Sequence, residues 1–386
     1  MDQLARIRSI IKEFDAQGHH RTGTRVDHES GAWLRDVLRE SGVDAEIESY
    51  PFSRLVPGDA SVSVGDERLD GLPGFDCILT TEGGVHGRLG PLGSAAEIGL
   101  CVVNPGGPAP ELDAAREANT HRAIVCLTVG PRPGLAPRNA TAYLSPYGPP
   151  LLQVSSEHRK TLEQWSGRGA ESTLKSSGSR VDGQASNVIA RIPGQNAALA
   201  PIVVMTPRSG WWQCASERGG GMACLAEVGR AFARAPLQRD LLLLASTGHE
   251  LGHWGLERFL GARPHLGRDA LLWLHLGASV GAALDPRPLV FGSDEPLRAL
   301  ARGAIDRARI LPPPVAAPSQ AVPGGESKNI HERGGRYVSF LGGSAVFHLE
   351  ADRWPAAVDV DAVAAYAAVC IDIVREADAK ARSTPA

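Results

Sequence analysis

The chain has 386 residues, of which 43% are hydrophobic and 22% charged, and its formal net charge at pH 7 is −3. This length allows two domains, or one large domain with an insertion, in an ordinary globular protein. The small net charge speaks against nucleic acid or an anionic membrane surface as a partner. No apolar run approaches the roughly 20 residues of a membrane span.

The N-terminus is an amphipathic pattern with acidic residues, and it lacks the apolar stretch and cleavage site of a secretory signal. This predicts a cytoplasmic location. The six cysteines are scattered without a C-x-x-C pair, so we expect reduced thiols. Cys101 and Cys126 lie in apolar runs and are predicted core residues. Cys214 lies in a polar, glycine-rich segment and is a candidate nucleophile.

Residues 1–54 are predicted to be the N-terminal part of an α/β domain. Apolar residues recur at helical spacing in the first 14 residues, and a second helical pattern covers residues 27–41. Segment 43–52 alternates between polar and apolar residues, which predicts a strand.

Residues 55–182 differ in composition, and we predict that they form a small β-rich inserted domain. Short β-like runs alternate with Gly- and Pro-rich turns, and one helical pattern lies among them at 109–121. Segment 176–186 is typical of a linker that returns to the first domain. The predicted strands of this region are 60–64, 77–81, 99–104, 123–130 and 151–155.

Residues 183–386 alternate strand patterns with helical patterns, which predicts the main α/β domain. Apolar strands joined by helices favour a mostly parallel central sheet with helices on both faces. The predicted strands are 187–194, 200–206, 240–247, 270–277 and 344–350. The predicted helices are 219–235, 253–262, 295–310 and 359–381.

The stretch LLLLASTGHELGHWGLERFL, residues 241–260, contains the strongest site signal. An unbroken apolar run ends near Gly248 and is followed by His249, Glu250 and His253. Ligands of open α/β sheets bind at the carboxyl ends of the strands, so these polar residues are predicted to lie at a site. The letters also match the zincin motif H-E-x-x-H, but that motif needs a helix through its first histidine, and the preceding strand and glycine favour the strand-end interpretation.

Several segments together resemble the co-catalytic zinc aminopeptidases related to glutaminyl cyclases, in the version with a protease-associated domain insertion. The resemblance covers nearly the whole chain. It rests on SNVIARIPG, PIVVMT, GGGMACLAEVGRAFARA, LLLLASTGHELGHWGLERFL and VFHLEADRWP. It implies a zinc-aminopeptidase-like fold and hydrolysis of amide-type bonds.

The resemblance also implies an altered metal site. The family's H-x-D pair falls on Arg208 and Gly210, its bridging aspartate on Glu217, its paired glutamates on His249 and Glu250, its next aspartate on Gly277 and its last histidine on His348. One of the two zinc ions would lose the ligands that it does not share with the other. The other would keep Glu217, Glu250 and His348, a plausible set for a single zinc with an open position, and His249 would be the catalytic base.

Further residues are predicted to contact a small-molecule or peptide substrate. The resemblance places pocket residues in the segment around Glu326, and Arg208 could hold a substrate carboxylate. The predicted substrate-binding residues are Arg208, Trp211, Trp212, His275, Glu326, Asn329 and His331. Structural alternatives stay open for Glu217 as an ion pair with Arg218, Glu250 as a helix N-terminal carboxylate, and His348 as a core histidine. The segment from Glu326 to His331 has the alternative of an ordinary surface loop.

Three functional hypotheses follow. The first is a hydrolase with one zinc; the second is a metal-free lyase, cyclase or amidohydrolase that uses His249, Glu250 and Arg208; the third is an inactive binding protein on the same fold. The sequence leaves open whether a metal is bound and whether the chain forms a homodimer.

Overall fold

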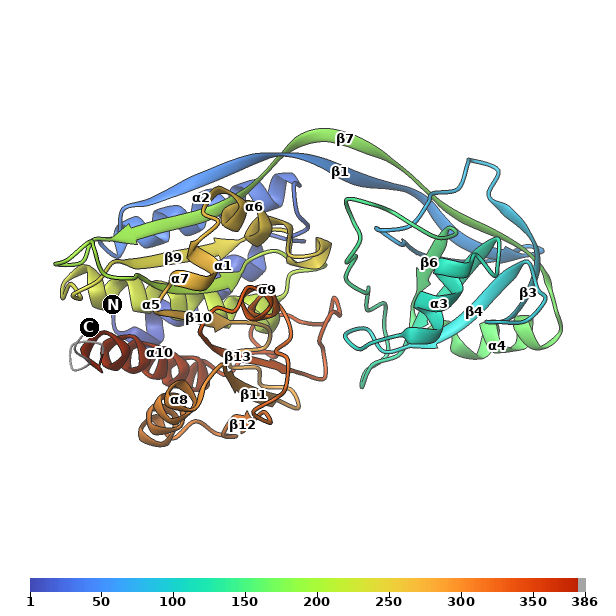
Figure 1. The fold of residues 1–386 in the computed structure, drawn as a ribbon. Helices are drawn as coiled ribbons and strands as arrows, with labels where there is room; N and C mark the ends of the chain where they lie inside the picture. Colours follow the sequence, from blue (N-terminus) through green and yellow to red (C-terminus); the bar gives the residue numbers. More distant parts are fainter. Residues whose placement is uncertain (381–386) are drawn as a thin grey trace.

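The computed structural model describes residues 1–380 and shows an α/β fold with a mixed, largely parallel central sheet covered by helices on both faces (Figure 1). The strand order is β1-β7-β9-β8-β10-β13-β11-β12. Strands β9, β8, β10 and β13 are mutually parallel, whereas β1 and β7 run antiparallel to their neighbours. Strand β11 is antiparallel to β13 and parallel to β12. The strands are β1 Ala45–Val64, β7 Glu171–Ile192, β8 Ile202–Pro207, β9 Leu241–Ser246, β10 Leu272–Leu276, β11 Arg287–Gly292, β12 Val315–Ala316 and β13 Tyr337–Gly343.

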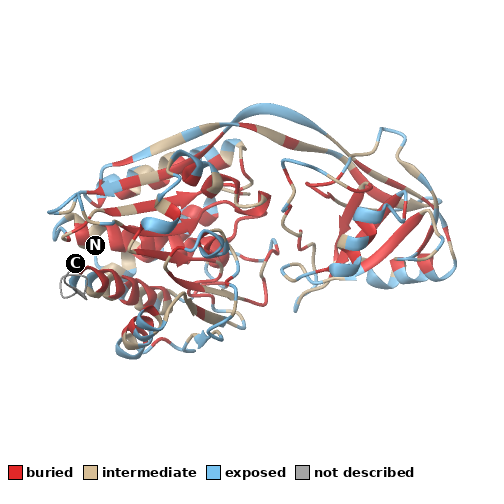
Figure 2. Cartoon of the chain, viewed as in Figure 1, coloured by how far each residue is buried: buried red, intermediate tan, exposed pale blue. Residues whose placement is uncertain are grey.

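Two helical layers cover this sheet because the apolar side chains of its central strands alternate between the two faces. Val204 and Leu243 face the layer of α1, α2, α5, α8 and α10, whereas Val203 and Leu244 face the layer of α6 and α9. Figure 2 shows the central strands buried between these layers. The helices are α1 Gln3–Ala16, α2 Arg25–Glu40, α5 Gly220–Ala233, α6 Trp254–Ala262, α7 Leu266–Asp269, α8 Glu295–Ala308, α9 Ser327–Glu332 and α10 Val360–Lys380. The predicted last helix extends to Ala381, which lies outside the described residues.

A second, smaller unit lies at the far end of β1 and β7, which pair along their length as a ribbon that leaves the main sheet (Figure 1). There the strands close into a ring of order β1-β2-β6-β5-β4-β3-β7 around its own apolar core. Its further elements are β2 Glu67–Pro73, β3 Val85–Pro91, β4 Ile98–Val103, α3 Pro110–Ala118, β5 Ala123–Thr128, β6 Leu151–Val154, a short 3₁₀ turn Ser156–His158 and α4 Arg159–Gly167. The domain boundaries at 54/55 and 182/183 stay a prediction; both fall inside β1 and β7, which continue through them.

Three predicted segments differ from the observed structure. Segment 344–350 is a series of turns and not a strand, and β13 supplies the strand beside β10 instead. The segment is apolar enough to suggest a strand because the turns bury Val346 and Leu349. Residues 77–81 form no strand, and residues 176–186 are part of β7 and not a linker.

All six cysteines are buried and unpaired with one another, and Cys101 and Cys126 are core residues as predicted. Cys214 is also buried, and burial raises the pKa of its thiol well above the usual range. A protonated, enclosed thiol is a poor nucleophile, so the candidate role of Cys214 gains no support. Among residues 1–380 no helix is both long and apolar enough to span a membrane.

Candidate functional site

The turn after β9 positions the candidate site at the carboxyl end of a central strand. Gly248 has a φ of 75°, and a Cβ there would lie 2.8 Å from the Cβ of Trp254, so this position favours glycine. The chain then forms a 3₁₀ turn, His249–Leu251, before α6 begins. His249 and His253 therefore do not lie on one continuous helix, as the strand-end interpretation predicts and a zincin motif would not allow.

Four histidines line a cavity of about 1070 Å³ between the main sheet and the β-rich unit: His249, His253, His275 and His348. We call it the histidine cavity. Burial is the main cause that lowers the pKa of each ring, to about 3 for His275. The four rings are therefore neutral at pH 7, and each can accept or donate a hydrogen bond.

Hydrogen bonds fix the orientation of three of these rings. The His348 Nδ1 donates to the Pro137 carbonyl oxygen at 2.6 Å, which leaves its Nε2 unprotonated in the neutral ring. The His275 Nδ1 lies 2.8 Å from Ser339 Oγ, and the His253 Nδ1 lies 2.7 Å from Asn329 Oδ1. The Nε2 atoms of His275 and His348 have no hydrogen-bond partner among the described residues.

Glu326, at the beginning of α9, is buried beside His249. Its Oε1 accepts a hydrogen bond from Ser246 Oγ at 2.6 Å and lies 3.8 Å from His249 Nδ1. Burial raises the pKa of Glu326 to about 7. This carboxyl group is therefore poised to exchange a proton near neutral pH.

Arg218 places a permanent positive charge beside the histidines. It lies in a π-helical turn, Ala215–Gly219, that precedes α5, and its Nη2 is 2.6 Å from Glu217 Oε1. Its Nε donates to the Ser209 carbonyl oxygen at 2.8 Å, and it is only 1% exposed. Its charge lowers the pKa of all four cavity histidines.

The sequence predicts the Arg218–Glu217 ion pair only as an alternative to metal binding, and it does not predict that Arg218 acts on the histidines. A basic residue directly before the GGG of a helix start was the available signal. Asp352, also missed by the sequence analysis, accepts hydrogen bonds from the backbone N–H groups of Ser216 and Glu217 at 2.8 and 2.9 Å. It thereby holds this turn in place.

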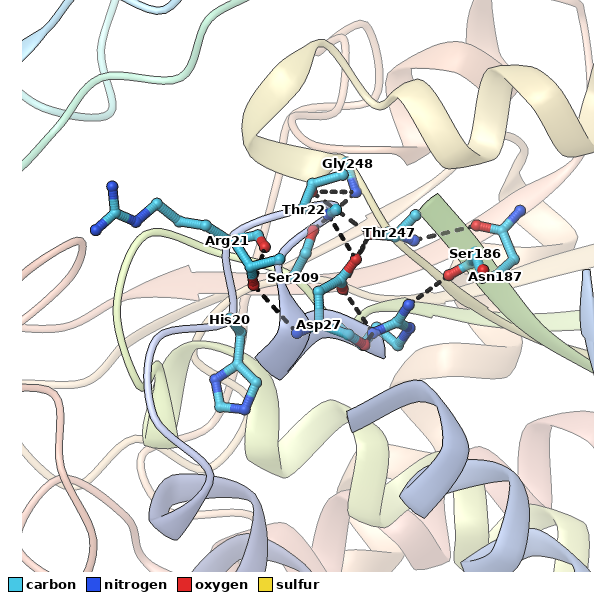
Figure 3. Close-up of polar contacts among 12 residues, drawn as sticks. His20, Arg21, Thr22, Asp27, Ser186, Asn187, Ser209, Thr247 and Gly248 are labelled. Atoms are coloured by element: carbon cyan, nitrogen blue, oxygen red, sulfur yellow. Dashed lines mark hydrogen bonds and ion pairs between the residues drawn. The ribbon is translucent and has the colours of Figure 1, made fainter. Parts of the chain in front are cut away.

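The predicted zinc ligands come together only in part. Glu217 Oε1 and His348 Nε2 lie 3.5 Å apart. The Glu250 carboxylate is engaged elsewhere: its Oε1 accepts from the Thr22 N–H and hydroxyl at 2.9 and 2.6 Å, and its Oε2 accepts from Ser209 Oγ at 2.7 Å. Figure 3 shows Thr22 and Ser209 in a polar cluster with Asp27 and Thr247.

The residues present do not fit a zinc ion. Within residues 1–380 no group of three or more His, Cys, Asp or Glu side chains has an arrangement that could hold a metal, whereas a catalytic zinc takes three protein ligands. The Arg218 guanidinium also lies against Glu217, so the carboxylate already has a cation.

Three of the predicted substrate-binding residues, Arg208, Trp211 and Trp212, do not line the histidine cavity. Arg208 is buried, and its guanidinium donates to Asp27 Oδ1 at 2.7 Å and to the Ser186 carbonyl oxygen, so its charge is paired inside the fold. Neither Trp211 nor Trp212 lines the histidine cavity. The Trp211 Nε1 donates to Asn139 Oδ1 at 3.1 Å, and the Trp212 Nε1 donates to the His348 carbonyl oxygen at 2.9 Å.

The segment around α9 divides between buried and exposed residues. Glu326 is fully buried, as a site residue would be, and Asn329 joins His253 to Glu257 through hydrogen bonds of 2.7 and 2.6 Å. His331 is exposed and contacts Tyr337 Oη at 3.1 Å. Only the first part of this segment therefore belongs to the surroundings of the cavity.

No protein-family model matches the chain, and the curated proteins provide no match either. Among solved structures, the zinc aminopeptidase BSAP of Bacillus subtilis matches with a TM-score of 0.78 and 16% identity over 99% of this chain and 96% of that chain. The aminopeptidase of Aneurinibacillus sp. strain AM-1 matches with a TM-score of 0.72 and 14% identity, over 97% and 93%. A peptidase M28 precursor of Shewanella amazonensis SB2B matches with a TM-score of 0.72 and 14% identity, over 97% and 95%. At these identities the matches show a common fold.

Proposed function

We propose that this chain is a hydrolase that cleaves an amide-type bond in a small peptide or amino-acid derivative bound in the histidine cavity, without a catalytic metal. The observation that carries the proposal is the arrangement of His249, Glu326 and Arg218 at the carboxyl end of β9. The likeness in fold to proteins described as aminopeptidases supports the class of reaction.

His249 is the proposed general base. Its Nδ1 faces Glu326 Oε1 at 3.8 Å, so the ionised carboxylate favours the tautomer with the proton on Nδ1 and leaves Nε2 able to accept a proton. This distance is long for a hydrogen bond, and catalytic contacts of this kind commonly shorten when a substrate binds. The burial that lowers the pKa of His249 keeps it neutral, which a base requires.

The reaction balances with one water molecule. A water proton passes to His249 Nε2 while the water oxygen attacks the carbonyl carbon. The same proton then passes to the amide nitrogen as the C–N bond breaks, which yields a carboxylic acid and an amine. Negative charge on the carbonyl oxygen is greatest in the tetrahedral intermediate, and a fixed positive charge nearby stabilises that state more than the substrate.

Arg218 is the proposed source of that fixed charge. It is always protonated, its position is held by Glu217 and Ser209, and it lies where its field reaches every histidine of the cavity. In this proposal Arg218 replaces the electrostatic effect that a zinc ion provides in a metallohydrolase.

The test is a screen of dipeptides, N-acyl amino acids and aminoacyl anilides with the purified full chain, read by mass spectrometry of the released amine. Each substrate is assayed with EDTA and, separately, with added zinc. We expect EDTA-resistant turnover that falls by about 100-fold or more in His249→Ala. Turnover that needs zinc would contradict the metal-free proposal, and no turnover of any substrate would favour the binding-protein hypothesis.

A further inference from the structure

A second cavity, of about 420 Å³, shares no lining residue with the histidine cavity. We call it the arginine cavity. Its lining includes Arg21 from the loop before α2, Arg54 from β1, and Glu250 from the turn after β9. It therefore lies where the ribbon of the β-rich unit meets the main sheet.

Arg21 and Arg54 are half-buried cations in the wall of this cavity. Among the described residues neither guanidinium group takes part in an ion pair or a side-chain hydrogen bond. Figure 3 shows the Arg21 side chain extending away from the polar cluster of Thr22, Asp27 and Ser209. Burial is the main cause that lowers the pKa of Arg21. The charge of Glu250 opposes this effect, and the positive charge of Arg54 adds to it. Like charges held together in a partly buried cavity are unfavourable unless an anion joins them.

The protein's own carboxylate does not balance these charges. Glu250 attracts Arg21, but its two oxygens accept hydrogen bonds from Thr22 and Ser209. One negative charge also faces two positive charges. The exposed Arg25 at the same cavity is already paired with Glu29 at 2.7 Å. The arginine cavity therefore keeps a net positive charge.

The remaining walls are aromatic and apolar, and hydrogen bonds hold them in place. Phe75 and Trp211 pack edge to face with ring centroids 4.8 Å apart. The Tyr143 Oη donates to the Ser53 carbonyl oxygen at 2.7 Å and accepts from the Leu55 N–H at 2.8 Å. A cavity with fixed aromatic walls and a few polar groups is typical of a small-molecule site.

We propose that the arginine cavity binds a small anion: a carboxylate or phosphate group, bonded by Arg21 and Arg54, on an aromatic or apolar body that packs against Phe75, Tyr143 and Trp211. A guanidinium group donates two parallel hydrogen bonds to either oxyanion, which suits both ligand types. The proposal is independent of catalysis in the histidine cavity.

The test is calorimetric titration of the full chain with 3-phenylpropionate and with phenyl phosphate, and 3-phenylpropionamide is the neutral control ligand. The variants are Arg21→Gln and Arg54→Gln. Arg8→Gln is the matched control, because Arg8 is an exposed arginine of α1 that does not line the cavity. We expect one or both anions to bind the wild type and Arg8→Gln equally, and to bind each cavity variant at least about tenfold more weakly.

Three outcomes would overturn the proposal: no binding of either anion at millimolar concentration, equal binding of the amide and the acid, or unchanged affinity in both cavity variants. Thermal unfolding of each variant separates a loss of binding from a loss of fold. Arg54→Gln removes a charge that repels Arg21, so we expect this variant to unfold at the wild-type temperature or above it. The relative affinity for the two anions identifies the preferred oxyanion.

Discussion

His249 and Glu250 are adjacent in the chain, yet their side chains line two separate cavities. The tight turn after Gly248 causes this divergence, because it directs one side chain toward Glu326 and the other toward Thr22 and Ser209. A single strand end thus supplies a residue to a neutral histidine cluster and a residue to a cationic cavity. The two cavities can therefore be tested separately.

Turnover in the histidine cavity is expected to depend on pH through Glu326. If the ionised carboxylate orients His249, the rate rises as pH increases through about 7, where the pKa of Glu326 lies. Glu326→Gln should lower the rate by about 100-fold and remove this rise. A pH–rate profile of wild type and variant measures both effects, and an unchanged rise in the variant would assign the titration to another group.

The same group predicts how stability changes with pH. Burial raises the pKa of Glu326 from 4.5 to about 7, so the folded state holds the proton more tightly than the unfolded state. The stabilisation from this group is complete below pH 4.5 and is lost as pH rises to about 7, by up to about 3 kcal/mol. Urea unfolding at pH 5 and pH 8 should therefore show a smaller loss of stability in Glu326→Gln than in wild type.

Asp352 requires a control in that experiment. Burial also raises the pKa of Asp352 to about 7, so it adds a pH dependence of the same sign. Because Asp352 is present in both wild type and Glu326→Gln, comparing these two proteins at the same two pH values isolates the contribution of Glu326. An identical loss in wild type and Glu326→Gln would show that Glu326 titrates at its ordinary pKa.

The turn itself can be tested with two glycines. Gly248→Ala should destabilise the protein by more than about 1 kcal/mol, because a side chain is strained at positive φ and would lie 2.8 Å from Trp254 Cβ. Gly261→Ala, in α6 with open space around it, should be neutral or stabilising by up to about 1 kcal/mol. Chemical denaturation compares the two variants, and equal effects would exclude a special constraint at Gly248.

The fold followed from local patterns, whereas the site depended on distant contacts. Runs such as Leu241–Leu244 and the helical spacing of α5 and α10 identify buried strands and helices directly. This works because apolar residues recur at a different spacing in strands than in helices. Local patterns also placed His249 at a strand end. They failed at segment 344–350, where buried turn residues imitate the apolar run of a strand.

The direction of individual side chains could not be predicted in the same way. Arg208 is bonded to Asp27, 181 positions away, and Glu250 to Thr22, 228 positions away. Neither partner can be recognised from the local sequence. Alignment with a metal-binding motif therefore assigns both Arg208 and Glu250 to the site. Arg218 was assigned only to an ion pair for the same reason, since its approach to four histidines from distant segments appears only in the folded chain.

Glu250 is expected to act on stability through its hydrogen bonds. Glu250→Gln replaces one acceptor oxygen with an amide donor that would face Thr22 or Ser209, and should destabilise the protein by about 1–3 kcal/mol. Thr22→Val removes one donor to the same carboxylate and should destabilise by a similar amount. Urea unfolding tests this, and an unaffected Glu250→Gln variant would show that the carboxylate is not held by these donors.

The ion pair of Arg218 and Glu217 provides the sharpest test of the metal-free proposal. Arg218→Gln removes the cation next to a carboxylate that is 1% exposed, and breaking a buried pair in this way costs about 3–5 kcal/mol. The double variant Arg218→Gln/Glu217→Gln leaves no buried charge at the pair and should be clearly less destabilised than the sum of the single variants. Urea unfolding of the four proteins completes the cycle.

The same substitution has an electrostatic consequence that stability alone would not show. Because the charge of Arg218 lowers the pKa of His275 and His348, Arg218→Gln should raise both pKa values, which NMR titration of the imidazole Cε1 protons can follow. Arg230→Gln is a matched control, since Arg230 belongs to α5 but does not contribute to the pKa of either histidine. Unshifted histidines in Arg218→Gln, or additive effects in the cycle, would mean that Arg218 does not set the electrostatics of the cavity, and the proposal that it replaces a metal ion would fail.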